Sequence, residues 1–269
     1  MSTFTRAASD AATVTRRNLI KIRRVPDLLV FTTLQPIMFV LLFAYVFGGA
    51  IGTQGTGVDY KEFLIAGIFA QTVVFGSTFT GYSIAEDLQK GFIDRFRTLP
   101  MSPSAMLFGR TLSDVFNNVI SLVVMGLSGL VVGWRIRGSA LDALGGALVL
   151  LVFAYAISWV MALVGLLVRT PEVVNNASFI VIFPMTFIAN TFVNPETLPG
   201  PLRTFAYWNP VSSVTQAARE LFGNTNPDFP PPDVWSLQHP VLYSLIWSAL
   251  VLAVFVPLAV RQYQRTTSR

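Results

Sequence analysis

The residues that usually carry metal, redox or nucleotide chemistry are nearly absent from this sequence. It contains no cysteine and a single histidine, His239, which excludes disulfides, thiolate nucleophiles and a zinc site. None of its three lysines is preceded by glycine, whereas a phosphate-binding P-loop requires a Gly-Lys pair. We therefore expect this chain to have no catalytic residue and no bound metal or cofactor, and not to be an enzyme.

Charged and polar residues inside apolar stretches are the first candidates for function. Asp114 lies in a stretch that is otherwise almost free of charge, and Arg110 precedes it by four residues, so the two can pair on a helix. A pair so near the end of a span is more typical of a structural contact than of proton coupling, which disfavours a carrier driven by an ion gradient. The uncharged polar residues that could line a transport path are Gln35, Gln71, Thr72, Asn117, Asn118 and Asn190.

Two of these patterns also fit simple packing. Asn117 and Asn118 share the helical face of Asp114, and in a membrane such amides often form hydrogen bonds between helices. The 22 phenylalanines could form an aromatic drug site, but in a bilayer most phenylalanines contact lipid or a neighbouring helix. Both alternatives remain open from the sequence.

The segment from Glu86 to Arg110 is a candidate for binding a partner protein. Large apolar residues recur there at i, i+4 and i+7, charged residues occupy other faces, and a proline ends the pattern. The apolar residues are Phe92, Phe96 and Leu99, the charged residues are Asp94, Arg95 and Arg97, and the proline is Pro100. Such an amphipathic helix suits a groove on a partner, but it equally suits a solvated connector whose aromatic residues pack on its own helix ends.

These groups need membrane-spanning helices to position them. The chain has 269 residues, of which 53% are hydrophobic and 12% charged, and this composition is typical of a membrane protein. A bilayer core of about 30 Å takes about 20 apolar residues per helix. Suitable stretches lie near residues 28–47, 63–85, 111–132, 143–168, 172–193 and 240–260. The sequence therefore predicts an all-α integral membrane protein with six transmembrane helices per protomer, in one domain over 28–260.

The distribution of basic residues predicts the orientation. Six spans place both termini on one side, and this layout puts 14 lysines and arginines on the side of the termini and 5 on the other. By the positive-inside rule both termini are then cytoplasmic. Arg135 and Arg137 oppose the trend and could bind phosphates of the outer leaflet. The net charge of +5 points to lipid headgroups and not to nucleic acid.

The two ends of the chain are expected to lie outside the spans. Residues 1–27 are basic and too polar for a signal peptide, and their apolar residues recur at helical spacing. This pattern favours a short interfacial amphipathic helix on the inner leaflet, with a disordered basic tail as the alternative. Residues 261–269 form a cytoplasmic tail.

The outer segment 194–239 contains one clear helix signal. Asn209 suits an N-cap, Pro210 suits the first helical position and Gly223 can end the helix, so residues 210–222 are predicted to be helical. The apolar residues of this helix fall on one face, so we expect it to lie in, or dip into, the outer leaflet.

Together these residues resemble the permeases of type-2 ABC transporters, and most of all the daunorubicin-resistance branch of drug and lipid exporters. The similarity to the cytoplasmic loop of that family rests on Gly91, Asp94-Arg95-Phe96, Leu99-Pro100-Met101-Ser102, Gly109-Arg110 and Asp114. The outer motif Tyr207-Trp208-Asn209-Pro210-Val211, followed by a helix, is also similar. The resemblance covers nearly the whole chain.

The resemblance implies a dimer of identical or related permeases above two ATPase subunits, which bind ATP and Mg. It implies that residues 89–99 form a coupling helix, that residues 194–223 form external re-entrant helices, and that spans 1, 2 and 5 of two protomers enclose the path. The implied ATPase contacts are Glu86, Asp87, Gly91, Phe92, Asp94, Arg95, Phe96, Arg97, Leu99 and Pro100. The implied external gate residues are Tyr207, Trp208, Asn209 and Pro210.

The sequence thus predicts the permease subunit of an ATP-driven exporter in a bacterial plasma membrane. Its substrate would be hydrophobic or amphipathic, such as a drug-like natural product, an antibiotic or a lipid-linked molecule. The alternatives are an integral membrane scaffold, an intramembrane enzyme and a gradient-driven carrier. An enzyme should show converging acidic, histidine or serine residues within the spans, and a carrier should show mid-membrane carboxylates and repeats.

Overall fold

The computed structural model describes residues 9–10, 12–18, 20, 34, 36–47, 60–91, 105–168, 170–192, 194–226, 228 and 230–267. Within these ranges every regular element is a helix and no residue lies in a strand. The predictions for Gln35 and for the segment from Phe92 to Pro100 fall outside the described residues.

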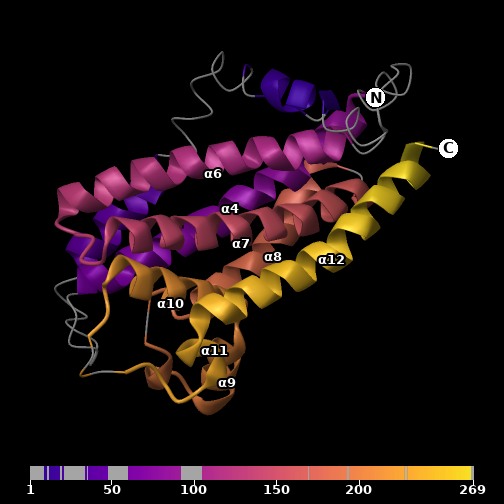
Figure 1. Ribbon diagram of the computed structural model, residues 1–269. Coiled ribbons are helices and arrows are strands. Elements are labelled where there is room, and N and C mark those ends of the chain that lie inside the picture. Colours follow the sequence, from indigo (N-terminus) through magenta and orange to yellow (C-terminus); the bar gives the residue numbers. More distant parts are fainter. Residues whose placement is uncertain are drawn as a thin grey trace.

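Long helices form a bundle in which α4 is central (Figure 1). In the described part of the chain, four helices are long and apolar enough to cross a membrane, which is consistent with an integral membrane protein. They are α4 (Tyr60–Gln89), α6 (Ala105–Val132), α7 (Ala140–Leu167) and α12 (Pro240–Thr267). Helix α4 packs against α6, α7 and α8, and α7 in turn packs between α4 and α12.

The remaining predicted spans are only partly matched by helices. Residues 36–41 are α-helical and continue into the π-helix η1 (Leu42–Phe47), which contacts α4. Helix α8 (Pro171–Phe187) has 17 residues and ends six residues before the predicted end of its apolar stretch at 193. The backbone instead turns over residues 188–192, because carbonyl and amide groups of this turn find partners on other helices.

Short elements gather at one end of the bundle, opposite the C-terminal end of α12 (Figure 1). They are η2 (Pro195–Thr197), α9 (Gly200–Trp208), α10 (Pro210–Phe222) and α11 (Trp235–Gln238). The predicted helix 210–222 and both of its caps are confirmed. The Asn209 side chain accepts a hydrogen bond from the Val211 amide, and Gly223 adopts φ 73°, a left-handed conformation that favours glycine.

Helix α10 is more deeply buried than its single apolar face predicted. Ser212, Ser213 and Thr215 on its other faces have no exposed surface. The helix packs against α4, α7 and α12, and does not lie on the bilayer with one side in solvent. Burial of the polar side is possible because several of these side chains form hydrogen bonds within the protein.

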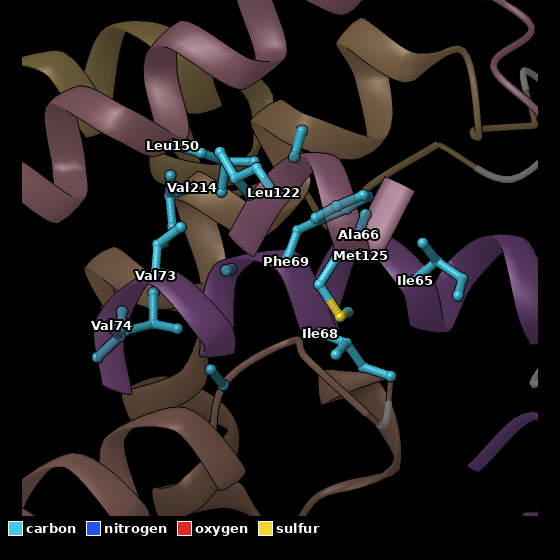
Figure 2. Packing of buried hydrophobic residues seen from close by; sticks show 14 of the residues in the cluster. Ile65, Ala66, Ile68, Phe69, Val73, Val74, Leu122, Met125, Leu150 and Val214 are labelled. Carbon is cyan, nitrogen blue, oxygen red and sulfur yellow. The ribbon is translucent and has the colours of Figure 1, made fainter. Parts of the chain in front are cut away.

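Close packing of apolar and small residues holds the bundle together. Figure 2 shows side chains of α4, α6, α7 and α10, including Phe69, Met125, Leu150 and Val214, in one buried cluster. Helices α4 and α7 come closest at Gly81 and Gly165, where a side chain on either glycine would collide with the backbone of the opposite helix. In a bilayer, helix association depends on such tight packing because lipid removes most of the hydrophobic driving force between helices.

Candidate transport machinery at the two ends of the bundle

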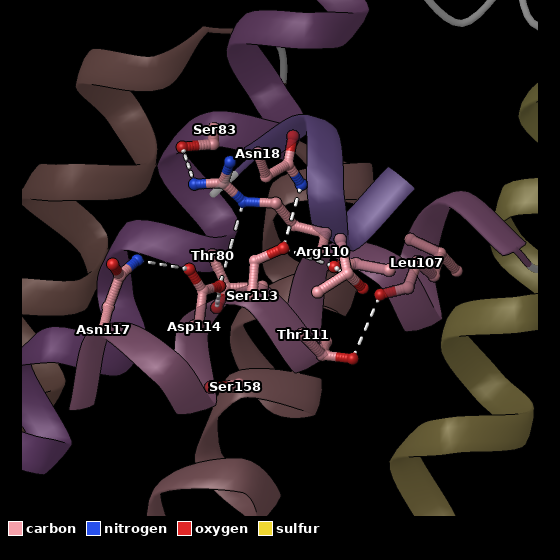
Figure 3. Close-up of polar contacts among 12 residues, drawn as sticks. Asn18, Thr80, Ser83, Leu107, Arg110, Thr111, Ser113, Asp114, Asn117 and Ser158 are labelled. Carbon is pink, nitrogen blue, oxygen red and sulfur yellow. Dashed lines mark hydrogen bonds and ion pairs between the residues drawn. The ribbon is translucent and has the colours of Figure 1, made fainter. Parts of the chain in front are cut away.

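A buried charged cluster joins α4 to α6 at the inner end of the bundle, which we define as the end nearer the 86–110 loop (Figure 3). Asp114 is 1% exposed, and its Oδ2 lies 3.8 Å from the Nε of Arg110, as the spacing predicted. The Thr80 hydroxyl of α4 donates a hydrogen bond to the same carboxylate oxygen. The Asn117 amide donates to Asp114 Oδ1 at 3.4 Å, within α6. The carboxylate is therefore fully engaged by protein groups.

Arg110 extends this inner cluster along α4. Its Nη2 donates a hydrogen bond to the Ser83 hydroxyl, and its guanidinium carbon lies 5.9 Å from the ring centroid of Phe79. Asn118, one turn beyond Asp114, is 3% exposed and packs against α4 at Gly76, where an added methyl group would be 2.7 Å from its amide oxygen. These contacts favour an interhelical role for Arg110 and Asn118.

The N-terminal helix packs on α6 beside the inner cluster. Residues 12–18 are helical and lie along α6 in Figure 1. The Thr15 hydroxyl donates to the Gly109 carbonyl at 3.2 Å, and the Asn18 amide donates to the Ser113 hydroxyl at 3.1 Å. The described part of this helix thus contacts the protein directly, through polar bonds that its amphipathic pattern did not predict.

The described start of the 86–110 loop is the end of α4. Glu86 and Asp87 lie in the last turn of that helix and are partly exposed. Lys90 Nζ lies 2.6 Å from Glu86 Oε1, and this hydrogen bond raises the pKa of the lysine. Gly91 follows with φ 66°, a left-handed conformation that ends the helix.

At the opposite end, Asn190 is the centre of a second polar network. Its backbone amide donates to the Ser212 hydroxyl at 3.0 Å, and its side-chain amide donates to Gln216 Oε1 at 3.2 Å. Both of its oxygens accept hydrogen bonds from Arg219. Asn190 was predicted as a residue that could line the transport path. Its polar groups instead bond to α10, and the residue is only 5% exposed.

Arg219 connects this network to α4. It is 2% exposed, and its Nη2 donates to the carbonyls of Asn190 at 2.7 Å and Thr191 at 3.3 Å. Its Nε donates to the Phe63 carbonyl of α4 at 3.0 Å, and its guanidinium carbon lies 3.5 Å from the Phe63 ring centroid. The Asn209 side chain adds a bond to the Met185 carbonyl of α8 at 2.7 Å. We define the outer junction as Phe63, Asn190, Thr191, Asn209, Ser212, Gln216 and Arg219.

The burial of Arg219 was not predicted: it is one of the five basic residues that the charge count placed on the outer side, and that count says nothing about burial. A usable pattern was present: Asn209, Ser212, Gln216 and Arg219 are spaced so that they share one face of a helix. Four polar residues on one face, opposite the apolar face, indicate that both sides of the helix have protein partners.

Other residues of the outer motif contact α11 and α12. Trp208 is 51% exposed, and the Tyr243 hydroxyl of α12 donates to its carbonyl at 2.8 Å. Trp235 lies edge-on to Tyr243 at 5.8 Å between ring centroids, and the Tyr207 carbonyl accepts a hydrogen bond from Ser236. Exposed tryptophans beside half-buried tyrosines are typical of a membrane–water interface.

The loop between α6 and α7 contains Arg137, a basic residue that opposed the positive-inside rule, and the structure shows its partner. Arg137 forms an ion pair with Glu62, with 2.7 Å between Nη2 and Oε1, and this carboxylate raises the pKa of the arginine. The Glu62 side chain is only 10% exposed, so the pair fixes this loop to the first turn of α4. Arg135 bonds to the carbonyls of Leu130 and Trp134.

The region from the N-terminal helix to the end of α10 matches a known family. The profile of that family, described as ABC-2 type transporter, covers residues 10–222. The chain belongs to the ABC-2 type transporters. The matched region contains both the inner cluster and the outer junction, and it ends at the last residue of α10.

Several relatives of this ABC-2 type transporter carry descriptive names. It is 37% identical over 261 residues to the daunorubicin resistance ABC transporter permease protein DrrB1 of Streptomyces coeruleorubidus, covering 96% of this chain and 88% of the relative. It is 26% identical over 218 residues to the doxorubicin resistance ABC transporter permease protein DrrB of Mycobacterium tuberculosis, covering 80% and 75%. It is 23% identical over 218 residues to the putative transport permease ycf38 of Porphyra purpurea, covering 80% and 74%.

Aromatic side chains of this ABC-2 type transporter form a continuous row along α8. Neighbouring ring centroids are 5.2 Å apart for Phe179 and Phe183, 4.1 Å for Phe183 and Phe187, and 4.9 Å for Phe187 and Phe192. Phe192 in turn stacks on Phe43 of η1 at 4.6 Å. Phe179 is 53% and Phe183 39% exposed, so part of the row faces away from the protomer.

The polar candidates on α4 lie closer to the protein interior. Gln71 is 6% exposed and Thr72 is half-buried. Among the described residues no group of three or more histidine, cysteine or acidic side chains could hold a metal ion. The polar candidates offer hydrogen bonds, and the phenylalanine row of α8 offers aromatic contacts.

Proposed function

We propose that this ABC-2 type transporter is the membrane-spanning subunit of an ATP-driven exporter of amphipathic, drug-like compounds. The observation that carries the proposal is the similarity to a daunorubicin resistance permease over 96% of the chain. Relatives named for doxorubicin resistance indicate the same class of substrate. Antibiotics and lipid-linked molecules share the same amphipathic chemistry.

The proposed layout has six spans, with both termini in the bacterial cytoplasm. The first span contains residues 36–47, and the fifth combines α8 with the following turn. The exposed aromatic residues of α9 and α11 support an outer interface at that end, while the basic N-terminal helix and tail suit the inner one. In this arrangement the 86–110 loop is cytoplasmic.

The proposed mechanism couples that loop to the spans. Two ATPase subunits bind ATP and Mg, and their closure pushes a coupling helix formed by residues 89–99. Helices α4 and α6 flank the loop and are joined by Thr80, Arg110 and Asp114, so a push on the loop moves both helices together.

The proposed path lies between spans 1, 2 and 5 of two permease protomers. Gln35, Gln71 and Thr72 would offer hydrogen bonds there, and the aromatic row of α8 would offer stacking surfaces for planar drugs. Asn118 and Asn190 would act mainly by fixing helices around the path, since each contacts another helix, whereas Asn117 would hold the Asp114 carboxylate within α6. Tyr207, Trp208, Asn209 and Pro210 would form the outer gate.

The test is purification of the tagged chain from its native membrane, with mass spectrometric identification of the proteins that co-purify. We expect an ATPase subunit in amounts comparable to the permease, and ATP-dependent uptake of doxorubicin into inverted vesicles that contain both. An ATPase variant lacking its P-loop lysine is the control and should give no uptake. Uptake that continues with this variant, or a chain that purifies without any ATPase, would contradict the proposal.

A further inference from the structure

Arg219 is a buried cation that neutral groups solvate. The hydrogen bonds of its guanidinium in the described part of the structure all go to carbonyl or amide oxygens, and the guanidinium also lies against the Phe63 ring. The acidic residues next to Phe63 and Arg219 in the sequence have other partners. Glu62 pairs with Arg137, and Glu220 accepts a hydrogen bond from Gln216. The charge therefore depends on dipoles and not on a carboxylate.

The oxygens that solvate Arg219 come from separate segments of the chain. Phe63 belongs to α4, and Asn190 and Thr191 belong to the turn after α8, whereas the arginine itself belongs to α10. A buried charge is tolerated only while its hydrogen bonds are complete. Withdrawal of the turn would remove three of the four hydrogen-bond acceptors of the cation, and withdrawal of α4 would remove the fourth together with the Phe63 ring. Separation of the three segments is therefore strongly disfavoured.

Further contacts hold the turn 188–192 against both α4 and α10. The Thr191 carbonyl lies so close to α4 that any side chain at Gly67 would collide with it. On the other side, the Asn190 amides bond to Ser212 and Gln216 of α10. The turn is thus held between α4 and α10, and Arg219 of α10 bonds both to the turn and to α4.

We propose that Arg219 is a positioning residue for export, which makes the outer end of α4, the turn 188–192 and α10 move as one body. This role rests on the proposed export function. Helix α4 leads directly into the 86–110 loop, so its movement during ATP hydrolysis reaches α10 through the outer junction. Without Arg219 the hydrolysis continues, but α10 no longer follows α4 and less drug leaves per ATP.

The experiment compares Arg219→Met and Arg219→Lys with the wild-type permease, each assembled with its ATPase in proteoliposomes. Arg203→Met is the matched control, because Arg203 is an exposed arginine of the nearby α9. The measured quantity is the number of doxorubicin molecules transported per ATP hydrolysed. We expect Arg219→Met to retain hydrolysis while this ratio falls at least about fivefold, the population change that accompanies loss of one ordinary hydrogen bond.

Arg219→Lys should recover part of the ratio, because an ammonium keeps the charge but cannot bond to both α4 and the turn as fully from a single nitrogen. Arg203→Met should match the wild type. A wild-type ratio in Arg219→Met would overturn the proposal. A proportional fall of hydrolysis and transport would also overturn it, since a purely structural role predicts that result.

A milder variant keeps the test informative if Arg219→Met does not assemble. Ser212→Ala removes only the acceptor of the Asn190 amide, and we expect the ratio to fall about twofold in a complex that still folds. An unchanged ratio in that complex would contradict the one-body movement. Absence of ATP-dependent export by the wild-type complex would instead refute the proposed function itself, and with it this role.

Discussion

Arg110 and Asp114 form an ion pair inside the bundle, so the loss of one charge should cost more stability than the loss of both. We expect Asp114→Leu to destabilise the protein by about 3 kcal/mol, because it leaves the mostly buried guanidinium of Arg110 without its carboxylate. The double variant Arg110→Met/Asp114→Leu should recover most of that loss, since both charges are removed together. The midpoint of thermal unfolding in detergent measures both effects.

The exposed pair of Glu86 and Lys90 provides the control for this prediction. Glu86→Gln removes the same kind of charge from a pair at the surface, and we expect no measurable change in the unfolding midpoint. A double variant no more stable than Asp114→Leu would show that Arg110 is not the group that requires the carboxylate.

The contact of Gly81 with Gly165 makes a second prediction for single residues. A side chain at Gly165 would collide with the α4 backbone, so Gly165→Ala should lower stability by about 1–3 kcal/mol, as overpacking usually does. Gly126→Ala is the matched control in α6, because an added methyl group there would meet its nearest atom only at 4.0 Å. Equal unfolding midpoints for both variants would contradict the close approach of α4 and α7.

At the scale of elements, the proposed coupling helix makes the sharpest prediction. If Phe92 and Phe96 insert into a groove of the ATPase, truncation of either should cost on the order of 2 kcal/mol of association, more than a tenfold loss of affinity. Arg97→Ala should cost less, because a charge at the rim mainly sets the encounter rate. The measurement is the amount of ATPase that co-purifies with each variant. Full recovery with intact transport in the double phenylalanine variant would rule out the coupling helix.

The elements also show what local sequence can and cannot predict. Helix α10 was predicted to the residue because Asn209, Pro210 and Gly223 determine its ends through local backbone chemistry. The end of α8 was placed too late, because hydropathy along 172–193 contains no information about the bonds from α10 to the turn. The Arg110–Asp114 pair followed from a spacing of four, whereas Thr80 and Ser83 joined it only through tertiary packing.

At the scale of the whole molecule, orientation in the membrane is the central prediction. Because the chain has no cysteine, single substitutions at Ser104 and Thr225 can be labelled by an impermeant thiol reagent without background. Ser104→Cys should react only after the membrane is opened, and the exposed Thr225→Cys should react in intact cells. Ser158→Cys, fully buried in α7, should stay unlabelled in both conditions. The reverse pattern would invert the proposed orientation.

The attachments of α4 give it the geometry of a lever. Thr80 is held at the inner cluster and Phe63 at the outer junction, 17 residues apart, or about 25 Å along the helix axis. Gly81, beside the inner attachment, touches α7 backbone to backbone and can serve as the pivot. A tilt of only about 5° around that point would displace the outer attachment by about 2 Å, because the arm is so long. A small angular change near the inner end of the bundle is thereby amplified at the opposite end without any helix having to bend.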